Sequence, residues 1–343
     1  MMRTHGGKKL SMALVCAALA GCEGWIVSPA ESNRNLADFE AAWAWVDSVY
    51  PAMEIKAVDW AGVYAEYRPL VEGALGDDFY QVLNDMLSVL RDPHLYYKTN
   101  GGARFHPYVS PRLQVGRKAF SAQLVRSYFD GELHVAGKDG VEYGMLTGNA
   151  GYIRITHFNT DGMMDDFPSV MAFVRETDGL IIDVRNNTGG DHDKVEGVVG
   201  MFIESEMAWP LAFNADGGLV EPWPAMQPIQ GPPRYTRPVV VLINGASLSS
   251  GELFPEVMRQ LPNVTLVGDT TAGASCNDRG GFRGDRRLPS GKMIHIPTWC
   301  ITRYDGVPWE LVGIAPDIRV AQTEADVAQG LDRQLEYALG LLR

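Results

Sequence analysis

The chain has few cysteines, few basic residues relative to acidic ones, and no long apolar run beyond its first residues. Only four of its 343 residues are cysteine, and no Cys or His spacing around Cys276 and Cys300 is typical of a zinc site. The formal net charge of −12 disfavours nucleic acid and anionic lipid surfaces as partners. After the N-terminal segment, no apolar stretch is long enough to span a bilayer. We therefore predict a globular body that needs no metal, nucleotide or other cofactor.

The N-terminal segment has the pattern of a bacterial lipoprotein signal peptide. A basic start (Arg3, Lys8 and Lys9) precedes an apolar stretch over residues 12–20 and the sequence Leu-Ala-Gly-Cys, which ends at Cys22. We predict that residues 1–21 are a signal peptide, that Cys22 is lipidated, and that residues 22–34 form a tether. This predicts a lipid-anchored protein of the bacterial cell envelope. Glu23 weakly favours the outer membrane, at its periplasmic face or at the cell surface.

Two cysteines remain once Cys16 leaves with the signal peptide and Cys22 is acylated. In an oxidising envelope, Cys276 and Cys300 can pair. A structural disulfide is the expected role of these two residues.

The rest of the chain divides by pattern at about residue 104. Residues 35–104 contain three amphipathic helical patterns ended by proline, typical of a small helical bundle. Residues 105–148 read as short strands in antiparallel hairpins, PRLQVG, SAQLVRSYFDG, ELHVAG and VEYGML. From Gly151 onward strands alternate with helices, which indicates an α/β sheet with helical crossovers. We predict a fold of the α+β or α/β class, with a helical N-terminal domain and a mixed core domain over residues 105–343.

Two strands of the predicted sheet end in unusual turns. GLIIDVRNNTGG, residues 179–190, is a buried strand followed by two glycines that let the backbone approach a ligand with its N–H groups exposed. RPVVVLINGASLSSGELF begins at Arg237 and reads as a buried strand, a serine-bearing turn and a helix. Such a turn can place a nucleophile beside free backbone amides. Taken alone, however, Ser249 and Glu252 also fit a capping box, which requires no catalysis.

Six segments, found in this order between Leu83 and Val320, resemble a family of serine peptidases. They are GYIRITHFN, GLIIDVRNNTGG, VVVLINGASLSSGELF, NVTLVGDTTAG, LPSGKMIHIP and WELVGIAPDI. The family contains the C-terminal processing (tail-specific) proteases, the tricorn protease core and the interphotoreceptor retinoid-binding protein modules. The resemblance implies a ClpP/crotonase-like superhelical ββα core and a serine nucleophile three residues before the acidic residue that opens the helix. That serine is Ser249.

The resemblance also implies which group acts as the base. The C-terminal processing branch has a lysine in a Gly-Lys-Gly loop, where this chain has Ala274, so the chain is similar to the tricorn-like branch. In that branch a histidine and a glutamate act, which correspond here to His94 and Glu310, with Asp92 as an alternative to Glu310. Tricorn cores place a serine before the histidine as a relay, whereas this chain has Pro93. Lys292 lies in a predicted hairpin turn and is the weaker candidate for the base.

The implied mechanism is acyl transfer to Ser249 with His94 as general base and a carboxylate that stabilises its cationic form. The oxyanion hole implied by the resemblance is the amide of Ser250 with that of Gly189 or Gly190. The segment Asp191-His192-Asp193 is expected to be a solvated helix cap and not a metal site.

The predicted function is therefore a cell-envelope serine peptidase that acts on peptide or protein substrates. Residues 105–148 are too few for a full PDZ domain of the kind that processing proteases insert. Two alternatives stay open: a binding module without catalysis, as in the retinoid-binding relatives, and an esterase that uses the same serine. The sequence gives no oligomeric state.

Overall fold

The computed structural model describes residues 29–74, 76–98, 102–229, 234–278 and 284–343. The predicted signal peptide, Cys22 and most of the predicted tether lie outside these residues. Over the described ranges, no helix combines the length and the apolar character that crossing a membrane requires.

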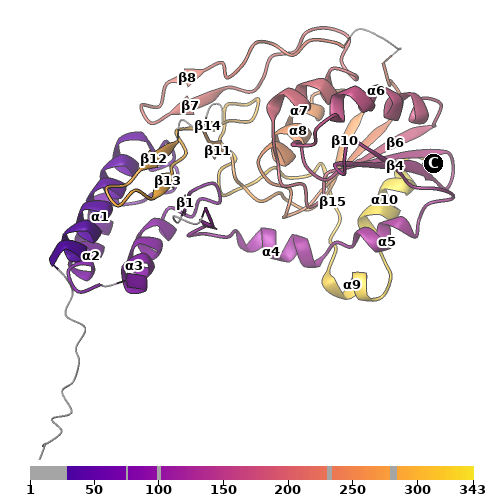
Figure 1. The fold of residues 1–343 in the computed structure, drawn as a ribbon. Helices are drawn as coiled ribbons and strands as arrows, with labels where there is room; N and C mark the ends of the chain where they lie inside the picture. The colour runs from indigo at the N-terminus through magenta and orange to yellow at the C-terminus, as the bar shows by residue number, and fades with distance from the viewer. Residues whose placement is uncertain (1–28, 75, 99–101, 230–233, 279–283) are drawn as a thin grey trace, which may run out of the picture.

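A seven-stranded mixed sheet forms the centre of the larger part of the molecule (Figure 1). In spatial order its strands are β15 (Ile318–Arg319), β10 (Val264–Gly268), β9 (Val239–Ile243), β6 (Gly179–Asp183), β5 (Ala150–Ile155), β4 (Val141–Leu146) and β3 (His134–Ala136). The strands from β15 to β5 pair in parallel, and β5, β4 and β3 pair antiparallel. Every residue of β6 and β9 is buried, which explains the continuous apolar run of β9 and the apolar residues 179–182 of β6, before the buried Asp183.

Helices cover both faces of this sheet (Figure 1). One face packs against α6 (Met163–Val174), α7 (His192–Val199) and α8 (Ser250–Met258), and the other against α5 (Ala122–Arg126) and α10 (Arg333–Leu341). Successive side chains of β9 serve the two layers in turn, since Val239, Val241 and Ile243 join the first core whereas Val240 and Leu242 join the second. The short helix α9 (Glu324–Ala328) precedes α10.

The smaller, helical part of the molecule has its own core. It contains α1 (Pro29–Val49), α2 (Trp60–Val71) and α3 (Gly76–Ser88), together with a four-stranded sheet of order β12-β13-β1-β2. These strands are β1 (Tyr96–Lys98), β2 (Arg104–Phe105), β12 (Asp285–Arg287) and β13 (Met293–His295). Leu288, Ile294 and Ile296 share one core with the helices. The helical part is thus built from two distant stretches of the chain, and the predicted boundary at residue 104 falls within β2.

A third sheet, of order β11-β14-β7-β8, lies beside the other two. Its strands are β11 (Cys276–Asn277), β14 (Trp299–Ile301), β7 (Ala212–Asn214) and β8 (Leu219–Val220). Cys276 and Cys300 are directly opposite each other on β11 and β14 and are joined by a disulfide.

Two local predictions were wrong. The segments PRLQVG and SAQLVRSYFDG, expected to be strands, form α4 (Pro111–Lys118) and α5. The hydroxyl of Ser121 caps α5 by accepting a hydrogen bond from the amide of Leu124 at 3.2 Å. Ser110 makes no such bond, and α4 begins at Pro111, a residue that favours the first turn of a helix. Helix α1 starts at Pro29, within the stretch predicted as a tether, and its first turn contains Glu31, where the helix dipole stabilises a negative charge.

Candidate active site

Ser249 occupies a strained turn between the central strand β9 and helix α8. Its backbone angles are φ 58° and ψ −121°, whereas an ordinary N-cap serine has extended-region angles. A non-glycine residue in this conformation costs about 1–3 kcal/mol and is concentrated at functional sites. The same strained geometry presents the nucleophile at the top of the sheet in other hydrolases with a strand-turn-helix serine. A capping role alone gives no reason for this strain.

Hydrogen bonds fix the turn against the loop that follows β6. The amide of Leu248 donates to the carbonyl of Asn187 at 2.9 Å, and the hydroxyl of Ser250 donates to the carbonyl of Gly190 at 2.6 Å. Because β6 and β9 are adjacent and parallel, both loops leave the same edge of the sheet. Ligand sites of open α/β sheets are found at this edge.

The capping interaction predicted for Glu252 is present and extends beyond the helix. The carboxylate of Glu252 accepts hydrogen bonds from the amide of Ser249 at 3.1 Å, from Thr271 Oγ1 at 2.6 Å and from the amides of Gly273 and Ala274 at 2.7 and 2.9 Å. Burial raises the pKa of this carboxyl, and these donors oppose the rise. Glu252 therefore links the serine turn to the loop in which the processing proteases carry their lysine.

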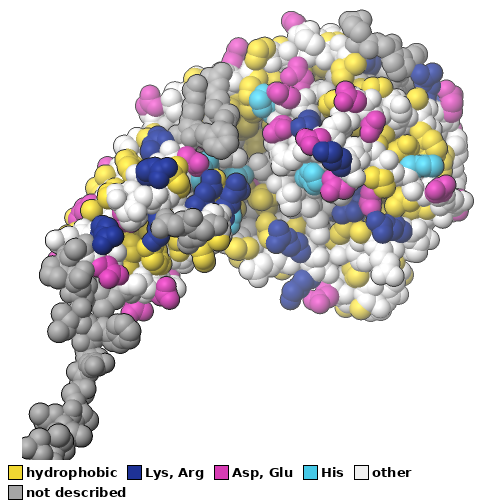
Figure 2. Space-filling model, in the orientation of Figure 1, with side chains coloured by type: hydrophobic (Ala, Val, Ile, Leu, Met, Phe, Trp, Pro, Cys, Tyr) yellow, Lys and Arg dark blue, Asp and Glu magenta, His cyan; other side chains and the backbone are white. Residues whose placement is uncertain are grey.

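A cavity of about 980 Å³ lies between the helical part and the α/β part, and Ser249 and His94 both line it. Figure 2 shows a hollow between the two parts, with basic and histidine side chains around it. The lining also includes Ser250, Gly190, Ala274, Ser275, Arg104 and Trp299. The structure therefore brings the predicted nucleophile and base to one concave site, although they lie far apart in the sequence.

His94 lies in the turn that leads from α3 to β1. Its amide donates to Asp92 Oδ1 at 2.8 Å, which fixes the backbone. Its ring Nδ1 is buried and has no hydrogen-bond partner among the described residues. Burial lowers the pKa of His94 from 6.5 to about 4, so the imidazole is neutral at pH 7. A neutral imidazole is the protonation state that a general base requires.

Three further histidines line the same cavity, which the sequence patterns did not indicate: His106, His192 and His295. His295 pairs with Asp285, since its Nδ1 lies 2.8 Å from Asp285 Oδ1. Its other ring nitrogen, Nε2, lies 3.4 Å from Asn277 Oδ1. His106 Nδ1 contacts the carbonyl of Pro93 at 3.1 Å. Both ring nitrogens of His295 are engaged, whereas His94 retains an unpaired one. The Asp285–His295 pair could not be inferred from the alternating pattern of β13, because Asp285 lies ten residues away in the sequence, on the neighbouring strand β12.

Among the described residues, Glu310 forms no hydrogen bond with Nδ1 of the His94 ring. Its Oε2 accepts hydrogen bonds from the amides of Ser275 and Cys276 at 2.7 and 3.1 Å and from the hydroxyl of Ser275 at 3.2 Å. Its Oε1 lies 2.7 Å from the ammonium of Lys56. Burial raises the pKa of Glu310 from 4.5 to about 7. Ser275 lines the cavity, so Glu310 acts on the wall of the site and not directly on the imidazole.

The candidate oxyanion donors are distinguished by their existing bonds. The amide of Gly189 already donates to Asn187 Oδ1 at 2.8 Å. Gly190 and Ser250 both line the cavity. The amides of Gly190 and Ser250 are therefore the better placed pair for a developing oxyanion.

No lysine lines the cavity among the described residues. Ala274, which the sequence resemblance matches to the lysine of the processing branch, lines the cavity. The ammonium of Lys292 lies 3.6 Å from the centre of the Tyr80 ring, in the helical part. Within the described chain, histidine is thus the available base.

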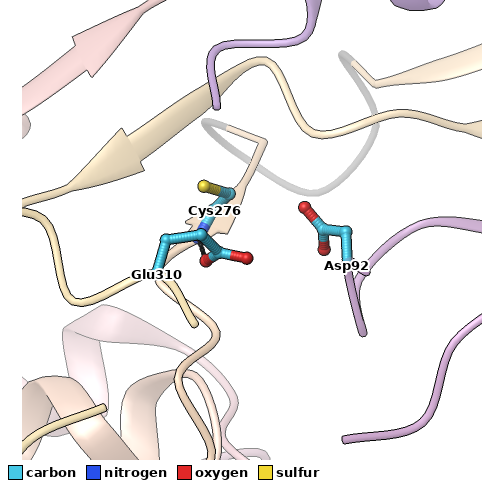
Figure 3. Close-up of side chains that lie close together, drawn as sticks. All are labelled: Asp92, Cys276 and Glu310. Atoms are coloured by element: carbon cyan, nitrogen blue, oxygen red, sulfur yellow. Dashed lines mark hydrogen bonds between the residues drawn. The ribbon is translucent and has the colours of Figure 1, made fainter. Parts of the chain in front are cut away.

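One cluster has the residue types of a metal site but not its chemistry. Asp92, Cys276 and Glu310 place ligand-type atoms within 4.8 Å of one another (Figure 3). The sulfur of Cys276 is bound in the disulfide with Cys300, and the ammonium of Lys56 lies 2.7 Å from Glu310 and 3.5 Å from Asp92. The ammonium of Lys56 already pairs with both carboxylates, and the thiolate that a soft metal prefers is absent because the sulfur is in a disulfide.

The fold and the site together are those of an α/β hydrolytic scaffold with a serine at the strand-helix turn. The model of peptidase family S41 matches residues 149–320, half of the chain, and the model of the tricorn protease C1 domain matches residues 33–88. The chain belongs to peptidase family S41. The predicted resemblance and fold class are thereby confirmed.

Curated relatives match the same region. The chain is 27% identical over 199 residues to the tricorn protease of Thermoplasma acidophilum, and 25% identical over 198 residues to a carboxyl-terminal-processing protease of Picosynechococcus sp.. These matches cover 57% and 56% of this chain but only 17% and 44% of the relatives' own lengths. The likeness therefore concerns the shared domain and not the whole of either relative.

Solved structures extend the likeness to nearly the whole chain. A crystal structure from Parabacteroides merdae, assigned as a peptidase, has a TM-score of 0.77 at 27% identity and covers 90% of this chain and 96% of that one. Mature CPAF complexed with lactacystin has a TM-score of 0.66 at 15% identity, over 91% of this chain and 98% of that chain. The second comparison shows a shared fold that includes the helical part.

Proposed function

We propose that the protein is a serine peptidase that hydrolyses peptide bonds through an acyl-enzyme on Ser249, with His94 as the general base. One observation carries this proposal: Ser249 holds a strained nucleophile-type conformation on the wall of a cavity that it shares with a neutral, unpaired histidine. Membership of a peptidase family supports the choice of reaction.

In the proposed mechanism, the hydroxyl of Ser249 attacks the substrate carbonyl carbon and gives its proton to His94. The amides of Ser250 and Gly190 donate to the oxyanion that forms, and each such donor contributes roughly 3–4 kcal/mol in comparable sites. The imidazolium then protonates the leaving amine, and a water molecule hydrolyses the ester in the reverse sense. The buried carboxylate of Asp92, which bonds the backbone amide of His94 at 2.8 Å, favours the cationic form of the ring.

Peptide turnover tests this proposal. The purified chain without its leader should release fluorescence from a quenched peptide library, and Ser249→Ala and His94→Ala should each lower the rate by at least roughly 10³-fold. Ser127→Ala is a matched control, because its hydroxyl bonds the carbonyl of Leu124 on the exposed side of α5 and lies outside the cavity. Ester hydrolysis without peptide hydrolysis would favour an esterase. Undiminished turnover by Ser249→Ala would refute the proposal.

We further propose that the protein is anchored in the cell envelope by a lipid on Cys22. The basic start, apolar stretch and Leu-Ala-Gly-Cys sequence support this location, as does the disulfide, since disulfides persist in oxidising compartments. Detergent phase partitioning of the expressed full chain tests it. The wild type should enter the detergent phase and Cys22→Ala should not; equal partitioning of both would contradict the anchor.

A further inference from the structure

A buried group of charges lies behind the cavity, where the helical part meets the α/β part. The ammonium of Lys56 donates to Tyr50 Oη at 2.6 Å and to the carbonyl of Arg91 at 3.3 Å. It also lies 2.7 Å from Glu310 Oε1 and 3.5 Å from Asp92 Oδ2. The side chains of Lys56, Asp92 and Glu310 have no solvent exposure. Tyr50 completes the group by donating to Asp92 Oδ2 at 2.7 Å.

These residues come from three separate segments. Lys56 lies in the turn between α1 and α2, Asp92 follows α3, and Glu310 belongs to the loop after β14. Figure 3 shows Asp92 facing Glu310 and Cys276 from the opposite side. Oxygen atoms of the Asp92 and Glu310 carboxylates lie within 4.8 Å of each other, and two ionised carboxylates at this distance in a buried site repel each other strongly. The ammonium between them is therefore the element that lets the two parts meet at this point.

Each carboxylate also holds one wall of the cavity. Asp92 uses Oδ1 to bind the amide of His94 at 2.8 Å. Glu310 uses Oε2 to bind Ser275 and Cys276 at distances of 2.7 to 3.2 Å. In both residues the other oxygen faces Lys56. The cation is thus connected, through one residue on each side, to the candidate base and to the wall beside Ala274.

We propose that Lys56 is a positioning residue of the active site: by lying between the Asp92 and Glu310 carboxylates and offsetting one of their two charges, it holds His94 and the Ser275 wall in position against Ser249. This rests on the proposed function. A buried ion pair need not add stability, and replacing one with apolar residues is often neutral. The link of both carboxylates to the cavity gives this group a role beyond stability.

The charge balance gives the proposal an electrostatic readout. The groups that face the ammonium are Tyr50, Asp92 and Glu310, together with the carbonyl of Arg91. The guanidinium of Arg91 bonds the carbonyl of Lys56 at 3.1 Å, and His94, His106 and His295 lie nearby. With Asp92 and Glu310 ionised, the three side chains of Lys56, Asp92 and Glu310 together carry one net negative charge, which favours an imidazolium at His94. Without Lys56 the group would carry two, so Glu310 would hold its proton to a higher pH.

The test is the rate at which a fluorophosphonate labels Ser249 between pH 5 and pH 9. In Lys56→Met we expect the acid limb of the rate to move upward by roughly 1–2 pH units, which lowers the rate at pH 7.5 by roughly 3- to 25-fold. Lys56→Arg keeps the charge and should retain the wild-type limb. Lys138→Met removes an exposed lysine that pairs with Asp161 at 2.8 Å on the surface, and should label as the wild type does.

A second variant guards against misfolding. Lys56→Met/Asp92→Asn removes one charge of each sign and leaves an acceptor for the amide of His94, so its acid limb should return to within about half a pH unit of the wild type. If Lys56→Met fails to fold, the double variant is the test. An acid limb of the double variant that lies roughly 1–2 pH units above that of the wild type would overturn the proposal. A folded Lys56→Met with the wild-type rate and limb would also overturn it. A wild-type protein that is not labelled at all would instead refute the proposed function.

Discussion

Gly189 packs directly against the candidate nucleophile, so adding one methyl group there should disable the site. A Cβ on Gly189 would lie 2.6 Å from Ser249 Cβ, 2.9 Å from the carbonyl of Leu248 and 3.1 Å from Ser249 Oγ. Ordinary contact begins at 3.4 Å, so Ser249 must retreat by about 0.8 Å. A displacement of about 1 Å at a reacting group costs roughly 100-fold in rate. We therefore expect Gly189→Ala to slow fluorophosphonate labelling by roughly 100-fold.

The backbone cost of the same substitution needs its own control. Gly189 has φ +86°, where alanine is strained by about 1–2 kcal/mol. Gly217, in the turn between β7 and β8, has φ +75° and nothing within 4 Å of the place that a methyl group would take, so Gly217→Ala carries similar strain without the clash. Urea unfolding should show comparable stability losses for both variants, while Gly189→Ala alone loses labelling. Equal labelling of the two variants would refute the packing of Ser249 against the loop after β6.

Three further predictions follow from buried groups. Because burial raises the pKa of Glu310 to about 7, the wild-type labelling rate should rise through about pH 7 as this carboxyl ionises. Glu310→Gln should lower the rate and remove this rise. A rise that is unchanged in Glu310→Gln would contradict the role of Glu310. Reducing the Cys276–Cys300 disulfide, which closes a loop over a separation of 24 residues, should lower the free energy of unfolding by about 3 kcal/mol, measured in urea with and without reductant; no change would contradict it. Arg185→Met should cost about 3–5 kcal/mol, because Arg185 bonds Asp183 and Asp332 in the core at 2.7 Å each, and a urea-measured loss below about 1 kcal/mol would contradict that view.

The strands of the central sheet could be predicted because their patterns have a single physical cause. β6 and β9 are buried on both faces, so β9 and residues 179–182 of β6 are continuous apolar runs, and the turns after them contain the small residues that a tight approach requires. The segment 111–126 could not be assigned in the same way. Its helices α4 and α5 are only 8 and 5 residues long, too short for a clear 3.6-residue period.

The candidate site was predictable only in part. The resemblance indicated Ser249, His94 and Glu310, and the structure brings the first two to one cavity. The contact of Lys56 with Glu310 spans more than 250 residues of sequence and leaves no local pattern. The Asp285–His295 pair depends on the register of β12 against β13, which apolar alternation alone does not reveal.

The central claim is that the hydroxyl of Ser249 is the group that forms a covalent bond with the substrate. Its most direct test is peptide mapping by mass spectrometry of the chain after reaction with a fluorophosphonate. The account predicts one adduct, located on Ser249, that is absent from Ser249→Ala and strongly slowed in His94→Ala. An adduct on a different residue, or peptide turnover that continues while Ser249 stays unmodified at saturating probe, would contradict it.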